Sequence, residues 1–383
     1  MTRIYMDNGA TSWPKTRTSI ERMVAFLKDD CSNINRTYGN AAEKDEDILL
    51  DLRMRLCDIF HHDHPETVIL NAGITESINT VVRGFFTERD HVITTSVEHN
   101  AVLRALTDSN IDFSMIPTDE RGKSDYHNLS SLLKSNTKAL IVTAGSNVTG
   151  FLEDLEVLSR FAKSNNLYFM VDTAQVSPFH KIDMHSLKID ALFFAGHKLF
   201  LAPEGTGGML LSPEIAAECR PLISGGTGSY SDVLSMPEVL PDKFEAGTRN
   251  LPGLMGLYGS VLEIQKNFER MEFSYKNKVS YLRENLREVS GVVLHGPGKD
   301  EESTGVISIT IPGLDPSRVA EMLKDHWGIE VRVGLHCAST AHKALGTYPE
   351  GTIRLTPGVF TSYNEIDTTI DAIKKIIDTR GNI

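Results

Sequence analysis

The sequence has 383 residues, of which 40% are hydrophobic and 23% are charged, and its formal net charge is −12. This composition is that of a globular protein with room for one large and one smaller domain. An acidic chain without a run of lysine or arginine is not expected to bind nucleic acid. No segment approaches the roughly 20 apolar residues that a membrane-spanning helix needs, so we expect no membrane partner.

The N-terminus lacks the long apolar stretch that marks a signal peptide. The cysteines are far apart in the sequence and form no CxxC or metal-binding pattern; they are Cys31, Cys57, Cys219 and Cys337. Cys31 lies at the end of a predicted helix, and Cys57 and Cys219 lie in helical contexts, so these three are expected to be structural. We therefore expect a cytoplasmic protein with free thiols and no metal site.

The chain begins with a predicted strand at residues 4–7 and two helices at residues 17–27 and 45–60, joined by a loop at residues 33–40. Strands and helices then alternate. The predicted strands are short and apolar, at residues 67–70, 91–95, 113–117, 139–143, 167–171, 191–195 and 208–211. The helices between them are predicted at residues 75–86, 101–107, 126–133 and 154–164. This alternation predicts an α/β fold with a mostly parallel, seven-stranded sheet covered on both faces.

The pattern changes after residue 250. A long helix is predicted at about residues 253–289, followed by a smaller α+β region. Its strands are expected at residues 292–294, 305–311, 329–333 and 352–355, and its helices at residues 316–326 and 363–379. We therefore predict a large domain over residues 15–252 and a small domain made of residues 1–14 and 253–383.

Lys198 directly follows the buried strand 191–195, after a glycine and a histidine. Desolvation lowers the pKa of a lysine toward the neutral amine that forms a Schiff base with a carbonyl, although a lone lysine here could equally be a surface residue. Asp172 ends another buried strand, and ligands of parallel sheets bind at the carboxyl ends of strands. This pair suits pyridoxal 5'-phosphate (PLP): Lys198 would bind the aldehyde, and Asp172 would keep the ring nitrogen protonated.

The motifs Asp172-Thr-Ala-Gln175 and Gly196-His-Lys198 resemble those of the class V aminotransferase superfamily of fold-type I PLP enzymes. Within this superfamily the match is to cysteine desulfurases and selenocysteine lyases. The resemblance runs nearly end to end, from Tyr5-Met-Asp-Asn-Gly-Ala-Thr11 to the C-terminal helix. It implies a fold-type I PLP-dependent transferase that works as a homodimer.

The resemblance also assigns the phosphate site. Gly73, Ile74 and Thr75 open a helix, and the free N–H groups of a helix N-terminus bind phosphate. His197 would add a further phosphate contact. Ala195 stands where the family usually has a hydroxyl residue, so one phosphate hydrogen bond is expected to be missing.

Four further residues are assigned to the cofactor by the resemblance. His99 would stack on the pyridine ring and move protons, although taken alone it could be a solvated histidine after a strand. Gln175 would bind the phenolic oxygen, and Asn147, in a sequence typical of a turn, would reach the ring oxygen or the substrate. Thr248 would cross the dimer interface to the phosphate of the other subunit, with Arg249 where the family often has proline.

The segment around Cys337 distinguishes the sulfur-handling enzymes. The resemblance assigns Cys337 as the thiolate that attacks sulfur or selenium, with His336 or a cationic neighbour raising its thiolate fraction. Leu335 replaces a histidine that is frequent in the family. Arg354 would bind the substrate carboxylate through its planar guanidinium, and Arg332 is a second candidate. The short stretch from Cys337 to Arg354 resembles the group-II, Suf-type enzymes.

The resemblance therefore implies a PLP-dependent cysteine desulfurase that converts L-cysteine to L-alanine. The sulfur would form a persulfide on Cys337 and pass to an acceptor protein or thiol. A selenocysteine lyase would use the same residues, whereas a class V aminotransferase would not need Cys337. If the chain were a binding protein without a cofactor, the presence of Lys198, Asp172 and Gln175 in these motifs would be a coincidence.

Overall fold

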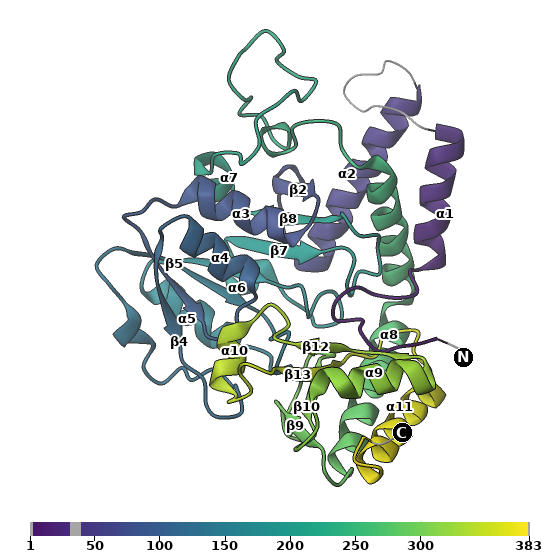
Figure 1. The fold of residues 1–383 in the computed structure, drawn as a ribbon. Coiled ribbons are helices and arrows are strands. Elements are labelled where there is room, and N and C mark those ends of the chain that lie inside the picture. Colours follow the sequence, from purple (N-terminus) through teal and green to yellow (C-terminus); the bar gives the residue numbers. More distant parts are fainter. Residues whose placement is uncertain (1–2, 31–39, 300, 382–383) are drawn as a thin grey trace.

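The structure is a computed structural model that describes residues 3–30, 40–299 and 301–381. Cys31 and most of the predicted loop 33–40 lie outside the described residues. Figure 1 shows a large α/β part and a smaller part that carries the C-terminus, with the long helix α8 (Leu251–Arg287) running from one to the other. Among the described residues, no helix is both long and apolar enough to cross a membrane.

The large part is built on the predicted seven-stranded sheet. Its strand order is β2-β8-β7-β6-β5-β3-β4. The strands are β2 (Val68–Asn71), β3 (His91–Thr95), β4 (Asp112–Ile116), β5 (Thr137–Thr143), β6 (Tyr168–Asp172), β7 (Ala191–Ala195) and β8 (Gly207–Leu211). Strands β7, β6, β5, β3 and β4 are parallel, and β8 is antiparallel to both of its neighbours. The predicted mostly parallel sheet is confirmed.

The sheet is apolar on both faces because helices cover both. Successive side chains of a strand point to opposite faces. Leu192 and Phe194 of β7 pack in one core with α2 (Asn40–Phe60), α5 (Leu155–Ser164) and α8. Ala191, Phe193 and Ala195 pack in a second core on the other face, with α3 (Ile74–Phe85), α4 (Asn100–Asp108) and α7 (Pro213–Glu218). Helix α6 (Met184–Leu187) and helix α1 (Arg17–Ala25), which packs on α8, complete the large part.

The helix predicted at residues 126–133 is wrong. The structure has a 3-10 turn at Leu129–Leu132 instead. The Ser131 hydroxyl donates to the carbonyl oxygen of Asn128 at 2.7 Å, and the backbone N–H of Ser131 donates to the same oxygen. A serine side chain competes in this way with helical hydrogen bonds, so the segment forms a turn.

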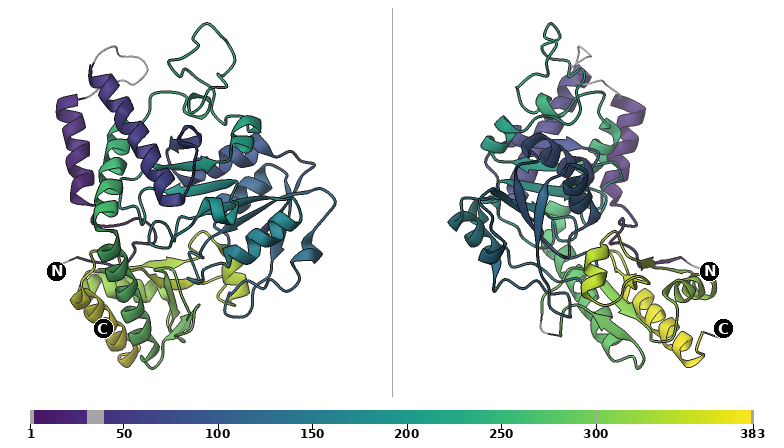
Figure 2. Two further views of the ribbon diagram at one scale, coloured as in Figure 1. Left: turned by 180° about the vertical axis from the view of Figure 1, so that it is seen from behind. Right: turned by 60° about the vertical axis from the view of Figure 1, so that its left-hand side comes forward.

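The smaller part contains a four-stranded antiparallel sheet in the order β12-β13-β10-β9. Its strands are β9 (Val293–His295), β10 (Ile307–Thr310), β12 (Arg332–Gly334) and β13 (Thr352–Leu355). Helices α9 (Pro316–Trp327) and α11 (Tyr363–Asp378) pack on it together with the end of α8. The views in Figure 2 show this part set to one side of the large sheet. The short helix α10 (Ser339–Ala344) lies between β12 and β13 in the chain.

The strand predicted at residues 329–333 is in fact two strands. Strand β11 (Ile329–Glu330) pairs in parallel with the N-terminal strand β1 (Ile4–Tyr5), whereas β12 pairs with β13. The segment changes its pairing partner at Val331, because the N-terminal strand β1 pairs with β11 and β12 pairs with β13. The N-terminal segment continues beside β13 through a bridge between Asp7 and Thr356.

Gly208 of β8 lies between the edge strand β2 and β7. A Cβ atom at this position would overlap the backbone oxygen of Ile69 and meet the ring of Phe194. We expect Gly208→Ala to destabilise the protein by about 3 kcal/mol, because the backbone of β2 would have to move. Urea unfolding measures the change. Gly225→Ala is the control, since its Cβ would have only ordinary contacts, and an equal loss in both variants would contradict this account.

Candidate active site

The predicted site residues meet at the carboxyl ends of the parallel strands, as expected for an open α/β sheet. His99 follows β3, Asn147 follows β5, Asp172 ends β6, and Lys198 follows β7. The smaller part contributes Arg332 from β12, Arg354 from β13 and Cys337 from the loop between them. The site therefore lies between the two parts of the molecule.

Lys198 is half-buried among groups of both charges. Burial lowers the pKa of Lys198 to about 8, and the nearby Arg354 and Arg332 lower it further while Asp172 opposes the shift. At this pKa a minor but accessible fraction of Lys198 is the neutral amine at physiological pH, which is the form that reacts with a carbonyl.

Asp172 is only 3% exposed, and it receives one hydrogen bond, from the backbone N–H of Ala174 at 2.8 Å. Burial raises the pKa of Asp172, and this hydrogen bond and the charge of Lys198 oppose the rise. Among the described residues no arginine or lysine forms an ion pair with it. A buried carboxyl group in this state can bind a cationic or N–H-bearing ligand.

His99 caps the N-terminus of α4. Its Nδ1 accepts a hydrogen bond from the backbone N–H of Ala101 at 3.1 Å, so the proton of the neutral ring lies on Nε2. Burial lowers the pKa of His99 to about 4, and Lys198 and Arg354 lower it further. His99 is therefore a neutral ring at physiological pH, suited to stack on an aromatic ligand.

An anion-binding cradle lies at the N-terminus of α3. Gly73 is the N-cap residue with φ of 137°, a conformation that favours glycine. The first N–H groups of the helix, at Ile74 and Thr75, have no partner within a helix and offer a positive dipole end. Thr75 is exposed. The buried Nδ1 of His197 also has no hydrogen-bond partner among the described residues.

Two amide side chains connect the site to other segments. Gln175 donates from Nε2 to the carbonyl oxygen of Gly9 at 3.0 Å. Asn147 donates from Nδ2 to the carbonyl oxygen of His336 at 2.6 Å, and its buried Oδ1 has no partner among the described residues. Thr248 is exposed and lines a pocket of about 250 Å³ together with Ala72 and Glu76, beside the N-terminus of α3.

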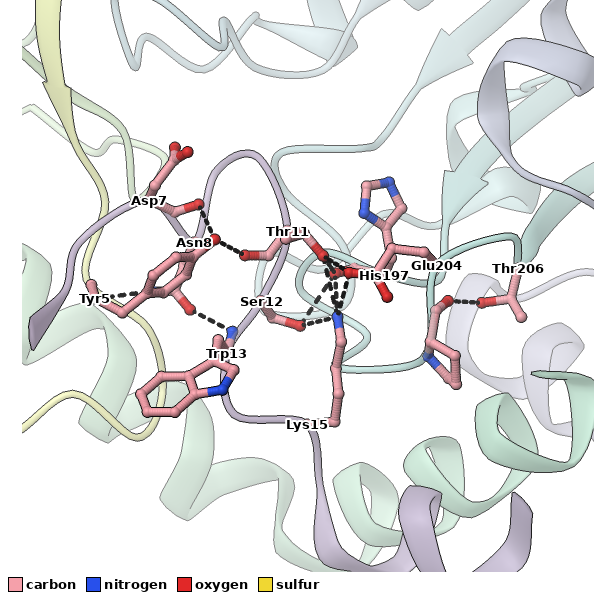
Figure 3. A network of polar contacts seen from close by, with 11 residues as sticks. Tyr5, Asp7, Asn8, Thr11, Ser12, Trp13, Lys15, His197, Glu204 and Thr206 are labelled. Atoms are coloured by element: carbon pink, nitrogen blue, oxygen red, sulfur yellow. Dashed lines mark hydrogen bonds and ion pairs between the residues drawn. The ribbon is translucent and has the colours of Figure 1, made fainter. Parts of the chain in front are cut away.

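The N-terminal segment contacts His197, the residue just before Lys198, as Figure 3 shows. The carbonyl oxygen of His197 accepts hydrogen bonds from the Thr11 hydroxyl at 3.1 Å, the Ser12 N–H at 2.9 Å and Lys15 Nζ at 3.0 Å. Burial lowers the pKa of Lys15 to about 8. Sequence reasoning missed Lys15, because nothing in its local sequence shows that it contacts a residue 182 positions away.

Arg354 is 2% exposed and lies directly opposite Arg332 on the neighbouring strand. Its guanidinium donates to Asp7 Oδ1 at 2.9 Å and to the carbonyl oxygen of Asn147 at 3.2 Å. Like charges placed opposite each other on a sheet repel, so the pair favours a bound anion. Sequence reasoning also missed Asp7, which neutralises part of this positive charge.

Cys337 is exposed and has φ of 58°, and the preceding His336 has φ of 47°. Left-handed backbone is uncommon at residues other than glycine, and it turns the Cys337 side chain out of the strand. The carbonyl oxygen of Cys337 accepts from the Asn100 N–H at 2.7 Å, at the start of α4. This bond fixes the cysteine loop beside His99.

The predicted help from His336 is wrong. Burial lowers the pKa of His336 to about 2, and Arg354 lowers it further. Its Nε2 pairs with the Thr352 hydroxyl at 3.0 Å. A neutral, buried imidazole supplies no positive charge to Cys337. Lys198 and Arg354 are the cations that interact electrostatically with the thiol.

Comparison with known proteins identifies the class to which this fold and site belong. Residues 4–369 match the family described as Aminotransferase class-V, so the chain belongs to this family. A probable cysteine desulfurase from Pyrococcus abyssi is 29% identical and covers 98% of this chain and 94% of its own length. A cysteine desulfurase from Pectobacterium carotovorum is 28% identical over 97% of this chain and 92% of its own length.

Solved structures agree with this family. The apo structure of a cysteine desulfurase from Thermococcus onnurineus NA1 has a TM-score of 0.89 at 29% identity, covering 98% of this chain and 95% of that one. A cysteine desulfurase from Escherichia coli has a TM-score of 0.86 at 23% identity over 98% of this chain and 95% of that one, which supports the fold alone. The predicted fold-type I architecture is confirmed.

The pKa of Lys198 can be tested on the apo protein. Because the neutral amine reacts, we expect reductive methylation of Lys198 to rise with pH and reach half of its maximum near pH 8. Asp172→Asn should move this midpoint to lower pH, since it removes the negative charge that favours the ammonium form. Peptide mass spectrometry follows the labelling.

Asp190→Asn is the matched control for this experiment. Asp190 is also a strand-end aspartate, but it accepts its hydrogen bond from the backbone of Phe169 and lies outside the site. A midpoint near pH 10 for Lys198, or an equal shift in both variants, would contradict the assigned environment.

Proposed function

We propose that this protein is a PLP-dependent cysteine desulfurase, which converts L-cysteine to L-alanine and takes the sulfur onto Cys337. One observation carries this proposal: a lysine of lowered pKa, a buried aspartate, a buried arginine and an exposed cysteine meet in one site. The names of the relatives support the same reaction.

The residues present suit PLP. The cradle at Gly73, Ile74 and Thr75 and the unpartnered Nδ1 of His197 would hold the phosphate. Asp172 would pair with the ring nitrogen, and His99 would stack on the ring. Gln175 and Asn147 would reach the ring oxygen. When bound, PLP supplies an electron sink that stabilises negative charge on the substrate carbon.

The protein's own groups account for the other steps. Arg354, with Arg332 opposite, would bind the substrate carboxylate. Lys198 as a neutral amine would remove the α-proton, a step that its pKa of about 8 favours. These groups would also orient the substrate with its sulfur toward the cysteine loop.

Cys337 would then attack the substrate sulfur as a thiolate. A sulfur–sulfur bond forms and the bond between Cβ and sulfur breaks. The carbon keeps the electron pair and takes up a proton, so that alanine and a persulfide on Cys337 are the products. Because Cys337 is exposed, an acceptor protein or thiol could collect this sulfur. The subgroup, group-II or Suf-type, stays a prediction from the short Cys337–Arg354 stretch.

A homodimer would complete the site. Ile20, Val24 and Leu27 form an apolar stripe on α1 and the turn after it, and they are 51%, 41% and 58% exposed. Leu50 and Met54 of α2 are also exposed, at 49% and 44%. Exposed apolar side chains that gather in this way mark a protein contact. Thr248 would reach the phosphate site of the other subunit.

The reaction predicts the behaviour of three variants with bound PLP. Lys198→Ala should abolish alanine release from L-cysteine, because the α-proton is no longer removed. Cys337→Ala should lower it by about 100-fold or more, since no thiolate attacks the sulfur. The matched control Cys57→Ala changes a buried cysteine of α2 and should keep activity.

Selenocysteine as a second substrate separates the alternative. If Cys337→Ala acts on selenocysteine but not on cysteine, the Cys337 thiol is needed only for the reaction with sulfur. If the wild type prefers selenocysteine to cysteine, the protein is a selenocysteine lyase. Full activity of Cys337→Ala on both substrates would refute the role of Cys337. Transfer of an amino group without release of sulfur would favour an aminotransferase.

The dimer has its own test. Val24→Asp places a charge in the exposed apolar stripe and should convert a dimer into monomers in light scattering, because the charge would be desolvated at the contact. Phe273→Asp is the control, since Phe273 on α8 is 71% exposed but lies away from the stripe. A wild-type monomer would contradict the proposed dimer.

A further inference from the structure

Glu98 is a buried acid that the proposed reaction does not use. It lies between strand β3 and His99, and it is 0% exposed. Glu98 directly precedes His99 in the chain and lies close in space to Asp172, and both of these residues are candidates for cofactor binding.

The Glu98 side chain joins the carboxyl ends of two neighbouring strands. Its Oε1 accepts from the Thr95 hydroxyl at 2.7 Å, at the end of β3. The same oxygen accepts from the backbone N–H of Thr143 at 2.8 Å, at the end of β5. Thr143 is in turn paired in register with Asp172 on β6. The carboxyl group of Glu98 therefore ties β3 to the strand beside Asp172.

The geometry favours the neutral acid. Oε2 of Glu98 is buried without a hydrogen-bond partner, and no lysine or arginine forms an ion pair with Glu98 in the described part of the chain. A carboxylate buried without a cation is strongly disfavoured. The other acids that face it are Asp172 and Glu153, and their charges would repel a second one.

We propose that Glu98 is a positioning residue that stays protonated, holds the ends of β3 and β5 together, and thereby positions His99 and Asp172 for the roles that they would have toward the cofactor. A neutral Glu98 leaves Asp172 as the group that carries the negative charge for the ring nitrogen. This role rests on PLP binding within the proposed function, but it does not depend on the desulfurase reaction.

The protonated state can be tested without any cofactor. Burial raises the pKa of Glu98 from 4.5 to about 8; the hydrogen bonds from Thr95 and Thr143 oppose this rise, and the charges of Asp172 and Glu153 add to it. Such a group stabilises the fold at low pH, and this contribution is lost as the pH rises from about 5 to about 8. We expect Glu98→Gln, which is neutral at every pH, to gain thermal stability relative to wild type as the pH rises over this range. A constant difference would overturn the protonated state.

The positioning role is tested by titrating the apo protein with PLP and following the absorbance of the bound cofactor. Glu98→Gln keeps an acceptor oxygen for Thr95 and Thr143, so its affinity should stay within about twofold of wild type. Glu98→Ala loses both hydrogen bonds, and we expect PLP affinity to fall by about 10-fold or more.

Glu153→Ala is the matched control. Glu153 is 7% exposed and also accepts two hydrogen bonds, from Ser124 at 2.9 Å and from Tyr126 at 2.5 Å, so it is a buried acid near Glu98 whose printed side-chain bonds do not join β3 to β5. It should lose thermal stability and keep PLP affinity. Equal losses of PLP affinity in Glu98→Gln and Glu98→Ala, or in Glu98→Ala and Glu153→Ala, would overturn the proposal. If Glu98→Ala does not fold, the thermal stability and the PLP affinity of Glu98→Gln still test the proposal. An absence of cysteine desulfurase activity would leave these readouts unchanged.

Discussion

The charge balance of the site depends on the buried carboxyl group of Asp172. Lys198 is near the positive charges of Arg354 and Arg332, and Asp172 at the end of β6 is the acid that interacts with it. In a site of low dielectric constant the attraction between Asp172 and Lys198 opposes the repulsion that the two arginines exert on Lys198. It also keeps the pKa of Lys198 from falling further, so the neutral and charged forms of the amine are both accessible near neutral pH.

The N-terminal segment is a second constraint, because it connects the two parts of the molecule across the site. It pairs with β11 and continues beside β13. Asp7 neutralises part of the charge of Arg354, and Lys15 binds the carbonyl oxygen of His197, just before Lys198. One short stretch thus orients both the group proposed to bind the substrate and the group proposed to bind the cofactor. A movement of the small part would therefore shift the surroundings of both Arg354 and Lys198.

Several features could be predicted from the sequence because they depend on local patterns. The apolar strands and the alternation with helices predicted the seven-stranded sheet, since a strand buried on both faces is apolar throughout. Other features depend on distant partners. The strand expected at residues 329–333 divides at Val331 because β1 takes one half. The helix expected at residues 126–133 is not formed, because the Ser131 hydroxyl competes for a backbone carbonyl oxygen.

The sequence by itself therefore determined the order of the elements, the α/β class and the residue types at the carboxyl ends of the strands, because these follow from periodicity and motif. Only the tertiary structure decided which of these residues carry charge. His336 looked like a cation for Cys337, yet burial leaves it neutral, and Arg354 and Lys198 take that place. The sequence analysis did not single out Glu98, whose role depends on its burial and on its two hydrogen bonds. Burial and distance between remote segments set these states, and neither is written in the local sequence.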